Sequence, residues 1–275
     1  MTRDEKLNLM LEKQEYDARD LVTIVELLRL PGGCPWDREQ THKTLRKDLI
    51  EETYEVIEAI DNEDPVLLRE ELGDLLLQVV MHARIEEEAG RATFDEVAGD
   101  VCRKMIHRHP HVFGDAKAET SGEVLQNWEV IKSEEKSRNT LTDKLQAIPR
   151  QLPALMRAAK VGKKAGVMDF PDAASALEKL REETLEVEEA MASGSEAAVF
   201  EEIGDLLFSA ANLARKAGVD PEEALVRATD KFIRRFAAVE AAARAEGSNL
   251  AELSSEKLDD LWKKSKKIKK KDTFC

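Results

Sequence analysis

The sequence predicts an all-α protein built as a tandem repeat of two antiparallel helical bundles. Apolar residues recur at helical spacing through most of the chain, and the alternation typical of strands is essentially missing. The composition agrees, since only 5% of the 275 residues are aromatic and 36% are charged. A pattern of acidic residues also occurs twice in the same register, which is the signature of an internal repeat. The length suits two domains of roughly 130 residues each.

The repeated pattern consists of five acidic residues, each displaced by the same interval (182 − 51 = 131). Their neighbours repeat as well, Thr53 with Thr184 and Gly73 with Gly204. Scattered surface acids would not keep this register, so the chain contains a duplicated domain with a duplicated site. The acids of the two copies are Glu51, Glu52, Glu55, Glu71 and Asp74, matched by Glu182, Glu183, Glu186, Glu202 and Asp205.

In the first half, helical spacing predicts helices over residues 21–30, 45–60, 66–88 and 94–107, and a further helix around Trp128. Pro65 is placed to begin the third of these helices. Residues 31–37, which hold two glycines and two prolines, read as a loop between the first two helices. The second half lacks this loop, and its counterpart there is the shorter segment 168–172.

The second half begins after a connection over residues 139–153, which contains Pro149 and Pro153. Helices are then predicted over 154–166, 173–192, 197–217 and 221–244, followed by a last helix through Trp262. The run Ser193-Gly194-Ser195 separates two of them. We therefore divide the chain into an N-terminal helical domain (1–138), a linker (139–153) and a C-terminal helical domain with a basic tail (154–275).

Charge and composition exclude several classes of function. A net charge of −14 argues against general nucleic-acid binding, and the lysine-rich end, 263–271, reads as a solvated tail. No apolar run approaches a membrane span, and the charged first residues do not resemble a signal peptide, so we expect a cytoplasmic protein. The three cysteines are far apart without a Cys-x-x-Cys pair, so neither a disulfide framework nor a thiolate metal site is indicated.

The repeated acids lie on the apolar side of their predicted helices. At 3.6 residues per turn, Glu52 and Glu55 share an arc with Leu45, Val56 and Ala59. An isolated Glu-x-x-Glu is usually an exposed helix face, but duplication in register favours a site. Burying even one unpaired carboxylate costs several kcal/mol, and no cationic residue is expected among these acids. A hard divalent cation, Mg²⁺ or Mn²⁺ in its place, would neutralise such a set of oxygen ligands.

Two further patterns recur after each set of acids. Lys104 and Arg108 stand four residues apart, as do Lys231 and Arg235, which favours an anionic ligand over a merely solvated face. Tryptophan precedes lysine by four residues twice, Trp128 with Lys132 and Trp262 with Lys266. A lone tryptophan is usually a core anchor, but this pairing could stack a base and hold a phosphate.

All five histidines lie in the first half, so chemistry shared by both repeats cannot depend on histidine. A capping or phosphate-contacting loop is favoured over a zinc site for His107, His109 and His111. Neither GxxxxGK[ST] nor GxGxxG occurs, which excludes phosphate binding by those loops at the level of motifs.

The acids resemble a known family signature. Glu51-Glu52-Thr53-Tyr54-Glu55 followed by Glu71-Leu72-Gly73-Asp74 resembles the EExxE…ExxD pattern of all-α nucleoside triphosphate pyrophosphohydrolases. The stretches at 32–37 (GGCPWD) and 107–115 (HRHPHVFGD), together with the tandem arrangement, narrow the resemblance to the MazG family over nearly the whole chain. Two departures stand out: His107 occupies a position where Arg is common, and residues 167–170 (VMDF) replace the usual Gly-Phe-Asp-Trp.

The resemblance implies roles for individual residues. Glu51, Glu52 and Glu55, with Glu182, Glu183 and Glu186, would be the catalytic acids. The Mg²⁺ ligands would be Glu52, Glu55, Glu71, Asp74, Glu183, Glu186, Glu202 and Asp205, with Glu51 and Glu182 flanking them. The substrate-binding residues would be Lys104, Arg108, Trp128, Lys132, Lys231, Arg235, Trp262 and Lys266.

We therefore expect a homodimeric, Mg²⁺-dependent enzyme that hydrolyses ribo- and deoxynucleoside triphosphates to monophosphate and pyrophosphate, in house-cleaning or control of the nucleotide pool. No motif indicates buried polar groups matched to one base edge, so a broad base range is expected. The alternatives are a specialised dUTPase, a phosphoribosyl-ATP pyrophosphatase, or a non-catalytic metal-binding helical scaffold. A di-iron bundle would need Glu-x-x-His, and the acidic helices offer Glu-x-x-Glu and Glu-x-x-Asp instead.

Overall fold

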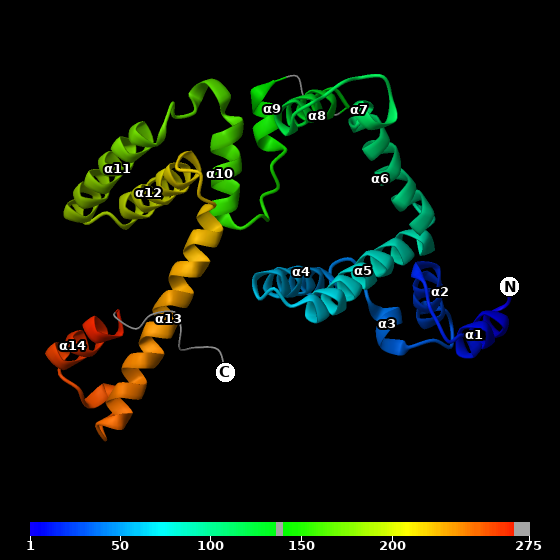
Figure 1. Cartoon of the computed structure of the whole chain (residues 1–275), viewed down its shortest axis with the longest axis horizontal. Coiled ribbons are helices and arrows are strands. Elements are labelled where there is room, and N and C mark those ends of the chain that lie inside the picture. The colour runs from blue at the N-terminus through cyan, green and yellow to red at the C-terminus, as the bar shows by residue number, and fades with distance from the viewer. Residues whose placement is uncertain (136–139, 267–275) are drawn as a thin grey trace. The chain divides into compact units, whose positions relative to one another are not determined.

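The computed structural model describes residues 1–135 and 140–266, and these residues form helices and loops with no β-strand (Figure 1). The chain divides into two compact units, Met1–Lys132 and Ser133–Cys275. The prediction of an all-α tandem repeat is confirmed, because each unit contains one of the two acidic helix pairs. No helix in the described ranges is long and apolar enough to cross a membrane.

The first unit is organised around a helical hairpin of α4 and α5, against which α2 packs. Its small core contains Val25, Leu45, Val80 and Met81. The helices are α1 (Arg3–Glu12), α2 (Ala18–Arg29), α3 (Pro35–Glu39), α4 (Arg46–Asp61), α5 (Pro65–Glu88), α6 (Phe94–Arg108), α7 (Pro110–Phe113) and α8 (Ser121–Glu135), the last of which continues past the boundary of the unit.

The second unit repeats the hairpin as α11 and α12, with α10 packed on α12. The long helix α13 leaves this group and carries α14 near its far end (Figure 1). Val239, Ala243 and Leu261 form the core between α13 and α14. The elements are α9 (Leu141–Gln146), α10 (Ala154–Lys164), η1 (Gly166–Met168), α11 (Ala173–Ser193), α12 (Glu196–Lys216), α13 (Pro221–Ala245), η2 (Leu250–Glu252) and α14 (Ser255–Ser265).

Local capping fixes where the acidic helices begin. Asp64 accepts hydrogen bonds from the first backbone amides of α5, and Pro65 occupies its first turn. Asp172 caps α11 and Ser195 caps α12 in the same way. Between these two helices Gly194 adopts φ 72°, a left-handed conformation that suits glycine at a helix end. Pro65 and the run Ser193-Gly194-Ser195 were predicted as helix boundaries, and the structure confirms them.

Four short helices were not predicted. The first, α1, begins with a capping box in which Thr2 and Glu5 bond reciprocally, and α9 begins with the same arrangement of Thr140 and Asp143. Pro35 starts α3 within the predicted loop, and Pro110 starts α7. Each is ten residues or shorter, so it has too few turns for hydrophobic periodicity to detect it. The basic tail beyond Lys266 lies outside the described residues.

A buried polar network ties α10 and η1 to α12 in the second unit. Arg215 donates through both terminal nitrogens to Asp169 and also bonds the Oδ1 atom of Asn212 at 3.0 Å. Asn212 is only 1% exposed and donates to the carbonyl of Phe208 at 3.0 Å. The network fits closely against Gly162, where a Cβ atom would stand 1.8 Å from Asn212 Oδ1. It therefore fixes the position of the helix that carries Glu202 and Asp205.

A second polar network joins His42 to the C-terminal half of α5 in the first unit. His42 Nδ1 lies 2.7 Å from His82 Nδ1, and His42 Nε2 lies 2.7 Å from Glu86 Oε1. Arg91 donates two further hydrogen bonds to Glu86, at 2.7 and 2.6 Å. The hydrogen bonds from Arg91, and then that from His42, lower the pKa of Glu86 to about 2.

We expect Glu86 to make the first unit acid-sensitive. Because its pKa is lower in the folded chain than in the unfolded chain, its stabilisation is fully present above about pH 4.5 and is lost as the pH falls toward 2. Glu86→Gln should therefore lower the thermal midpoint of the first unit at pH 7, and the difference from wild type should shrink steadily below pH 4.5. A difference that stayed constant from pH 7 to pH 3 would contradict this assignment. Calorimetric scans at several pH values measure it.

Candidate metal and triphosphate sites

The first acidic cluster lies between α4 and α5. Glu52, Glu55 and Glu71 each place a carboxylate oxygen within 4.8 Å of the others. Glu52 and Glu71 are half-buried and Glu55 is exposed. Burial raises the pKa of Glu52, and the negative charges of Asp74 and Glu55 raise it further. Burial and the charge of Glu55 likewise raise the pKa of Glu71, so this cluster resists carrying its full negative charge.

The second cluster lies at the matching place between α11 and α12. Glu183, Glu186 and Glu202 bring carboxylate oxygens within 4.8 Å of one another, and Glu183 is buried, at 5% exposure. A hydrogen bond with Glu183 raises the pKa of Glu186, and burial adds to the effect. The structure thus brings together three of the four predicted ligands in each repeat.

The fourth predicted ligand of each repeat stands outside these groups. Asp74 and Asp205 are exposed on α5 and α12. Asp74 is still close enough for its charge to raise the pKa values of Glu52 and Glu71. The flanking acids Glu51 and Glu182 are also exposed, and each pairs with a lysine on its own helix, at 3.8 Å from Lys47 and 2.7 Å from Lys179.

The two clusters differ in one cation. Lys179 Nζ lies 2.7 Å from Glu182, 3.0 Å from Glu183 and 3.9 Å from Glu186, and hydrogen bonds to Glu182 and Glu183 raise its pKa. The expectation that no cationic residue stands among the acids is therefore wrong for the second repeat. In the first repeat Asp48 occupies the matching position, and no ion pair joins Glu52, Glu55 or Glu71 to another described residue.

Lys179 was missed although its place in the sequence carried a signal. It precedes Glu183 by four residues, which is the spacing at which side chains on a helix meet. The first repeat has Asp48 at the matching position, so this cation is specific to the second repeat.

The donor sets fit a hard divalent cation. Both clusters offer only carboxylate oxygens, which suit Mg²⁺ or Mn²⁺ better than softer metals. The raised pKa values in the first cluster show that its charges repel one another, and a bound dication would remove that repulsion. Neither group contains a histidine or cysteine, so the described residues offer no zinc-type site of three such ligands.

The basic and aromatic residues of the first repeat form a packed group. Arg108 is buried, at 8% exposure, and its guanidinium carbon lies 5.3 Å from the ring centroid of Trp128. His109 meets the same ring edge-on at 4.9 Å. Lys104 is exposed, and Lys132 lies 3.8 Å from Glu129. Arg108 was predicted to face an anionic ligand and Trp128 to stack a base, and the structure packs these two side chains against each other.

The corresponding residues of the second repeat lie along α13 and α14. Trp262 is half-buried and packs on Phe232, with ring centroids 5.1 Å apart. Lys231 and Lys266 are exposed, and Arg235 is half-buried. Within the described residues, neither Lys231 nor Arg235 forms an ion pair with the acids of α11 and α12.

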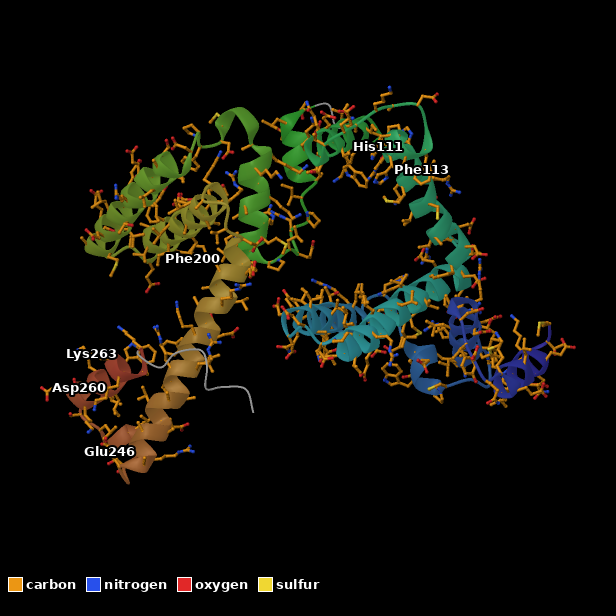
Figure 2. The ribbon with its side chains drawn as sticks, in the orientation of Figure 1. His111, Phe113, Phe200, Glu246, Asp260 and Lys263 are labelled. Atoms are coloured by element: carbon orange, nitrogen blue, oxygen red, sulfur yellow. The ribbon has the colours of Figure 1, made fainter. Side chains whose placement is uncertain are left out.

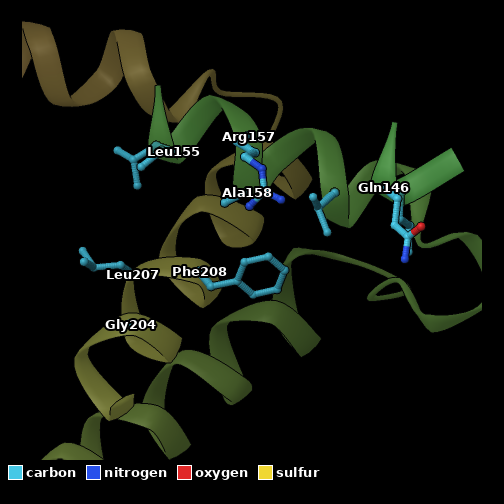
Figure 3. Close-up of a pocket in the computed structure, with 10 residues that line it drawn as sticks. Gln146, Leu155, Arg157, Ala158, Gly204, Leu207 and Phe208 are labelled. Carbon is cyan, nitrogen blue, oxygen red and sulfur yellow. The ribbon is translucent and has the colours of Figure 1, made fainter. Parts of the chain in front are cut away.

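An apolar pocket of about 520 Å³ is lined by residues of α9, α10 and α12 and contains none of the acids of the second cluster (Figure 3). Leu207 and Phe208 of α12 and Leu155 of α10 line it, and Gly204 leaves it open. Because successive residues turn by about 100° on a helix, Gly204 and Leu207 lie on a different face of α12 from Glu202. The pocket is therefore separate from the carboxylates.

Comparison with known proteins places these sites in a family context. The MazG nucleotide pyrophosphohydrolase domain matches residues 40–113 and 156–239, one match over each acidic hairpin. A protein of Thermotoga maritima named nucleoside triphosphate pyrophosphohydrolase/pyrophosphatase MazG is 45% identical over 249 residues, covering 90% of this chain and 94% of that protein. The nucleoside triphosphate pyrophosphohydrolase of Escherichia coli K12 is 44% identical over 90% of this chain and 96% of its own length. The Mycobacterium tuberculosis protein of the same name is 41% identical over 55% of this chain.

Proposed function

This chain belongs to the MazG nucleotide pyrophosphohydrolase family, and from that premise we propose that it hydrolyses nucleoside 5′-triphosphates to the monophosphate and pyrophosphate. The observation that carries the proposal is the pair of acidic clusters, which recur in register on two helical hairpins. A non-catalytic scaffold would not need carboxylates held in mutual repulsion, since that repulsion opposes folding.

We assign Mg²⁺ as the metal and Mn²⁺ as its substitute. Glu52, Glu55, Glu71 and Asp74 would hold it in the first repeat, and Glu183, Glu186, Glu202 and Asp205 in the second. When bound, the ion would polarise the phosphoryl oxygens and lower the pKa of a water molecule. The protein holds the acids on two rigid helices joined by a short turn, so the carboxylates are oriented before substrate arrives.

Lysine and arginine residues would supply positive charge that faces the negatively charged triphosphate. Lys104 and Arg108, and Lys231 and Arg235, would face the triphosphate and balance the charge that develops as pyrophosphate leaves. Trp128 with Lys132, and Trp262 with Lys266, would contact the base side. Glu51 and Glu182 flank the ligands and would assist catalysis from beside the metal.

We further propose a homodimer. Large apolar side chains are exposed on the helices of the second unit, among them Phe200, which is 84% exposed and projects from α12 (Figure 2), and Phe236 on α13. Arg235 lies on α13 and Trp262 on α14, whereas the acids lie on α11 and α12, so we propose that a second subunit completes the site. Contiguous exposed apolar surface is typical of interaction sites.

Sedimentation equilibrium should give about twice the chain mass of 30.9 kDa. Replacing Phe200 by Ser should weaken the association, because it removes exposed apolar surface without touching an acid. The exposed Phe113 of the first unit, changed to Ser, serves as a control. A fully active monomer at micromolar concentration would refute the dimer.

The substrate range follows from the base contact. Trp262 offers an aromatic face, and stacking stabilises any base by roughly 1–3 kcal/mol, so it discriminates poorly. A cytoplasmic enzyme of this kind would serve house-cleaning or control of the nucleotide pool. The specialised alternatives, a dUTPase or a phosphoribosyl-ATP pyrophosphatase, would instead need buried polar groups matched to one substrate.

Phosphorus NMR of the products from a panel of ribo- and deoxynucleoside triphosphates with Mg²⁺ tests the proposal. We expect monophosphate and pyrophosphate from several of them, with kcat/KM values within about two orders of magnitude at the second repeat. Trp262→Ala should raise KM for all substrates together. Stepwise release of orthophosphate, or a preference above about a thousandfold for dUTP or phosphoribosyl-ATP, would replace this function with an alternative.

A further inference from the structure

The helix face that carries the first pair of acids differs in charge between the two repeats at one position. At spacings of four and three residues, this face holds residues 48, 52, 55 and 59 of α4, and residues 179, 183, 186 and 190 of α11. Two of these positions are glutamate in both repeats, and a third is alanine in both. The remaining position is Asp48 in the first repeat and Lys179 in the second, a change from −1 to +1.

Lys179 contacts the acids of its own repeat directly. Its Nζ atom lies 3.0 Å from Glu183 Oε1 and 3.9 Å from Glu186 Oε2, and both glutamates belong to the second cluster. The same atom lies 2.7 Å from the flanking Glu182. The side chain of Glu183 is 6% exposed and that of Lys179 is 34% exposed, so water screens this pair less than a pair on the open surface. Lys179 therefore places a positive charge at two of the proposed metal ligands.

An ordinary ion pair along a helix does not reach the clustered acids, and the first repeat contains one of this kind. Lys47 Nζ lies 3.8 Å from the flanking Glu51, and both side chains are largely exposed. Exposed pairs of this type contribute little. No ion pair joins the three acids of the first cluster to another described residue. The first cluster is therefore without the cation that the second one has.

An ammonium group and a metal ion compete for the same carboxylate oxygens. Metal binding at Glu183 and Glu186 requires Lys179 to give up its contacts with them, or leaves the ammonium beside a divalent cation that repels it. In either case the free energy of those contacts opposes metal binding. In the first repeat no such contact is lost, and the half-buried Asp48 adds negative charge that attracts the ion.

We propose that Lys179 competes with the divalent cation for Glu183 and Glu186, so that the second repeat binds the metal more weakly than the first in the absence of nucleotide. The inference rests on the metal sites of the proposed function and deepens it, because it assigns the two repeats different metal affinities. As the metal concentration rises, the first repeat fills before the second. Without metal, Lys179 stabilises the second unit, since its charge offsets the repulsion among the acids.

Binding of Mn²⁺ without nucleotide tests the difference between the repeats. The Glu183→Gln/Glu186→Gln protein retains the acids of the first repeat, and the Glu52→Gln/Glu55→Gln protein retains those of the second. Electron paramagnetic resonance of free Mn²⁺ measures the dissociation constant of each protein, at an ionic strength of about 0.15 M that screens distant charges. We expect the first repeat to bind Mn²⁺ at least about tenfold more tightly, a difference of about 1.4 kcal/mol.

Exchanging the two residues supplies the matched comparison. Lys179→Asp should lower the dissociation constant of the second repeat at least about tenfold, and Asp48→Lys should raise that of the first by a similar factor. Lys179→Gln removes the cation without adding an acid, so it should have the same direction and a smaller size. Lys160, an exposed lysine of α10 without an ion pair among the described residues, provides the control. Lys160→Asp changes the net charge equally and should alter the constant less than about twofold.

Thermal unfolding in EDTA gives a second readout, which does not depend on turnover. Lys179→Asp should lower the midpoint of the metal-free second unit, because it leaves the acids without their cation. Saturating Mn²⁺ should then raise the midpoint of this variant by more than that of the unsubstituted protein, since a tighter ligand stabilises the folded state more. If Lys179→Asp is unfolded in EDTA, Lys179→Gln provides the same comparison.

Equal Mn²⁺ dissociation constants for the two repeats, or a constant that Lys179→Asp leaves unchanged, would overturn the inference. The proposed function would stand in that case, because the release of monophosphate and pyrophosphate is measured separately. Absence of Mn²⁺ binding from both single-repeat proteins at millimolar concentration would instead refute the metal sites, and with them both the proposed function and this inference.

Discussion

Changing both Glu183 and Glu186 to Gln should abolish turnover at the second site, and changing Glu52 and Glu55 to Gln should do the same at the first. An amide cannot neutralise a metal cation, and loss of a single preorganised electrostatic group already costs about 10²–10³-fold in kcat. The protein with all four substitutions should therefore fall by at least about 10³-fold in kcat/KM with Mg²⁺. Release of monophosphate from ATP, followed in all three proteins, measures the effect.

In the first repeat the substitutions should abolish turnover without lowering stability. This result would distinguish loss of the metal site from loss of the fold. The pKa of Glu52 is raised, so its charge opposes folding of the metal-free protein. Glu52→Gln/Glu55→Gln should then unfold at a temperature no lower than wild type. Glu183 pairs with Lys179, so the second pair of substitutions should bring no such gain. Wild-type activity in the fourfold variant would show that the assignment of the site is wrong.

Gly162→Ala should destabilise the second unit by about 3 kcal/mol, at the upper end of the range for overpacking. The new Cβ atom would stand 1.8 Å from Oδ1 and 2.8 Å from Cγ of Asn212, which is 1% exposed. Asn212 cannot turn away without breaking its bonds to Arg215 and to the carbonyl of Phe208. The thermal midpoint of this unit should fall by about 10 °C.

Gly162→Ala should also lower turnover at the second site, because it displaces α12, the helix that carries Glu202. Gly204→Ala is the matched control, since a Cβ atom there meets nothing within 4 Å. Alanine also favours a helix over glycine by about 0.5–1 kcal/mol, so Gly204→Ala should leave the midpoint unchanged or raise it. Equal midpoints for the two alanine variants in calorimetry would contradict the close packing of α10 on α12.

The repeat itself was the most reliable prediction from sequence. Acids displaced by one constant interval could only be explained by duplication, and each three-residue cluster forms where the periodicity of α4, α5, α11 and α12 places it. The helix boundaries at Pro65 and at Ser195 could also be predicted, because proline and serine favour the start of a helix. Short helices such as α3 could not, because they have too few turns for a period to appear.

The environment of the acids could not be predicted, because it depends on side-chain contacts that hydrophobic periodicity does not reveal. Lys179 differs from other surface lysines only by the three carboxylates that it meets. Gln78 and His82 belong to no motif in the sequence, and only the structure shows that each has one buried atom without a hydrogen-bond partner among the described residues. Arg108 was predicted as a contact to an anionic ligand, but its burial against Trp128 could not be predicted, because the two residues are distant in sequence.

Hydrolysis in ¹⁸O-labelled water, with Mg²⁺ and ATP, tests most directly whether the acidic clusters support pyrophosphohydrolysis. If water attacks the α-phosphorus, the label appears in the monophosphate, pyrophosphate is released unlabelled, and the fourfold acid variant yields neither product. Mass spectrometry of both products reads this outcome. Label found only in orthophosphate would mean attack at the terminal phosphorus and would contradict the account.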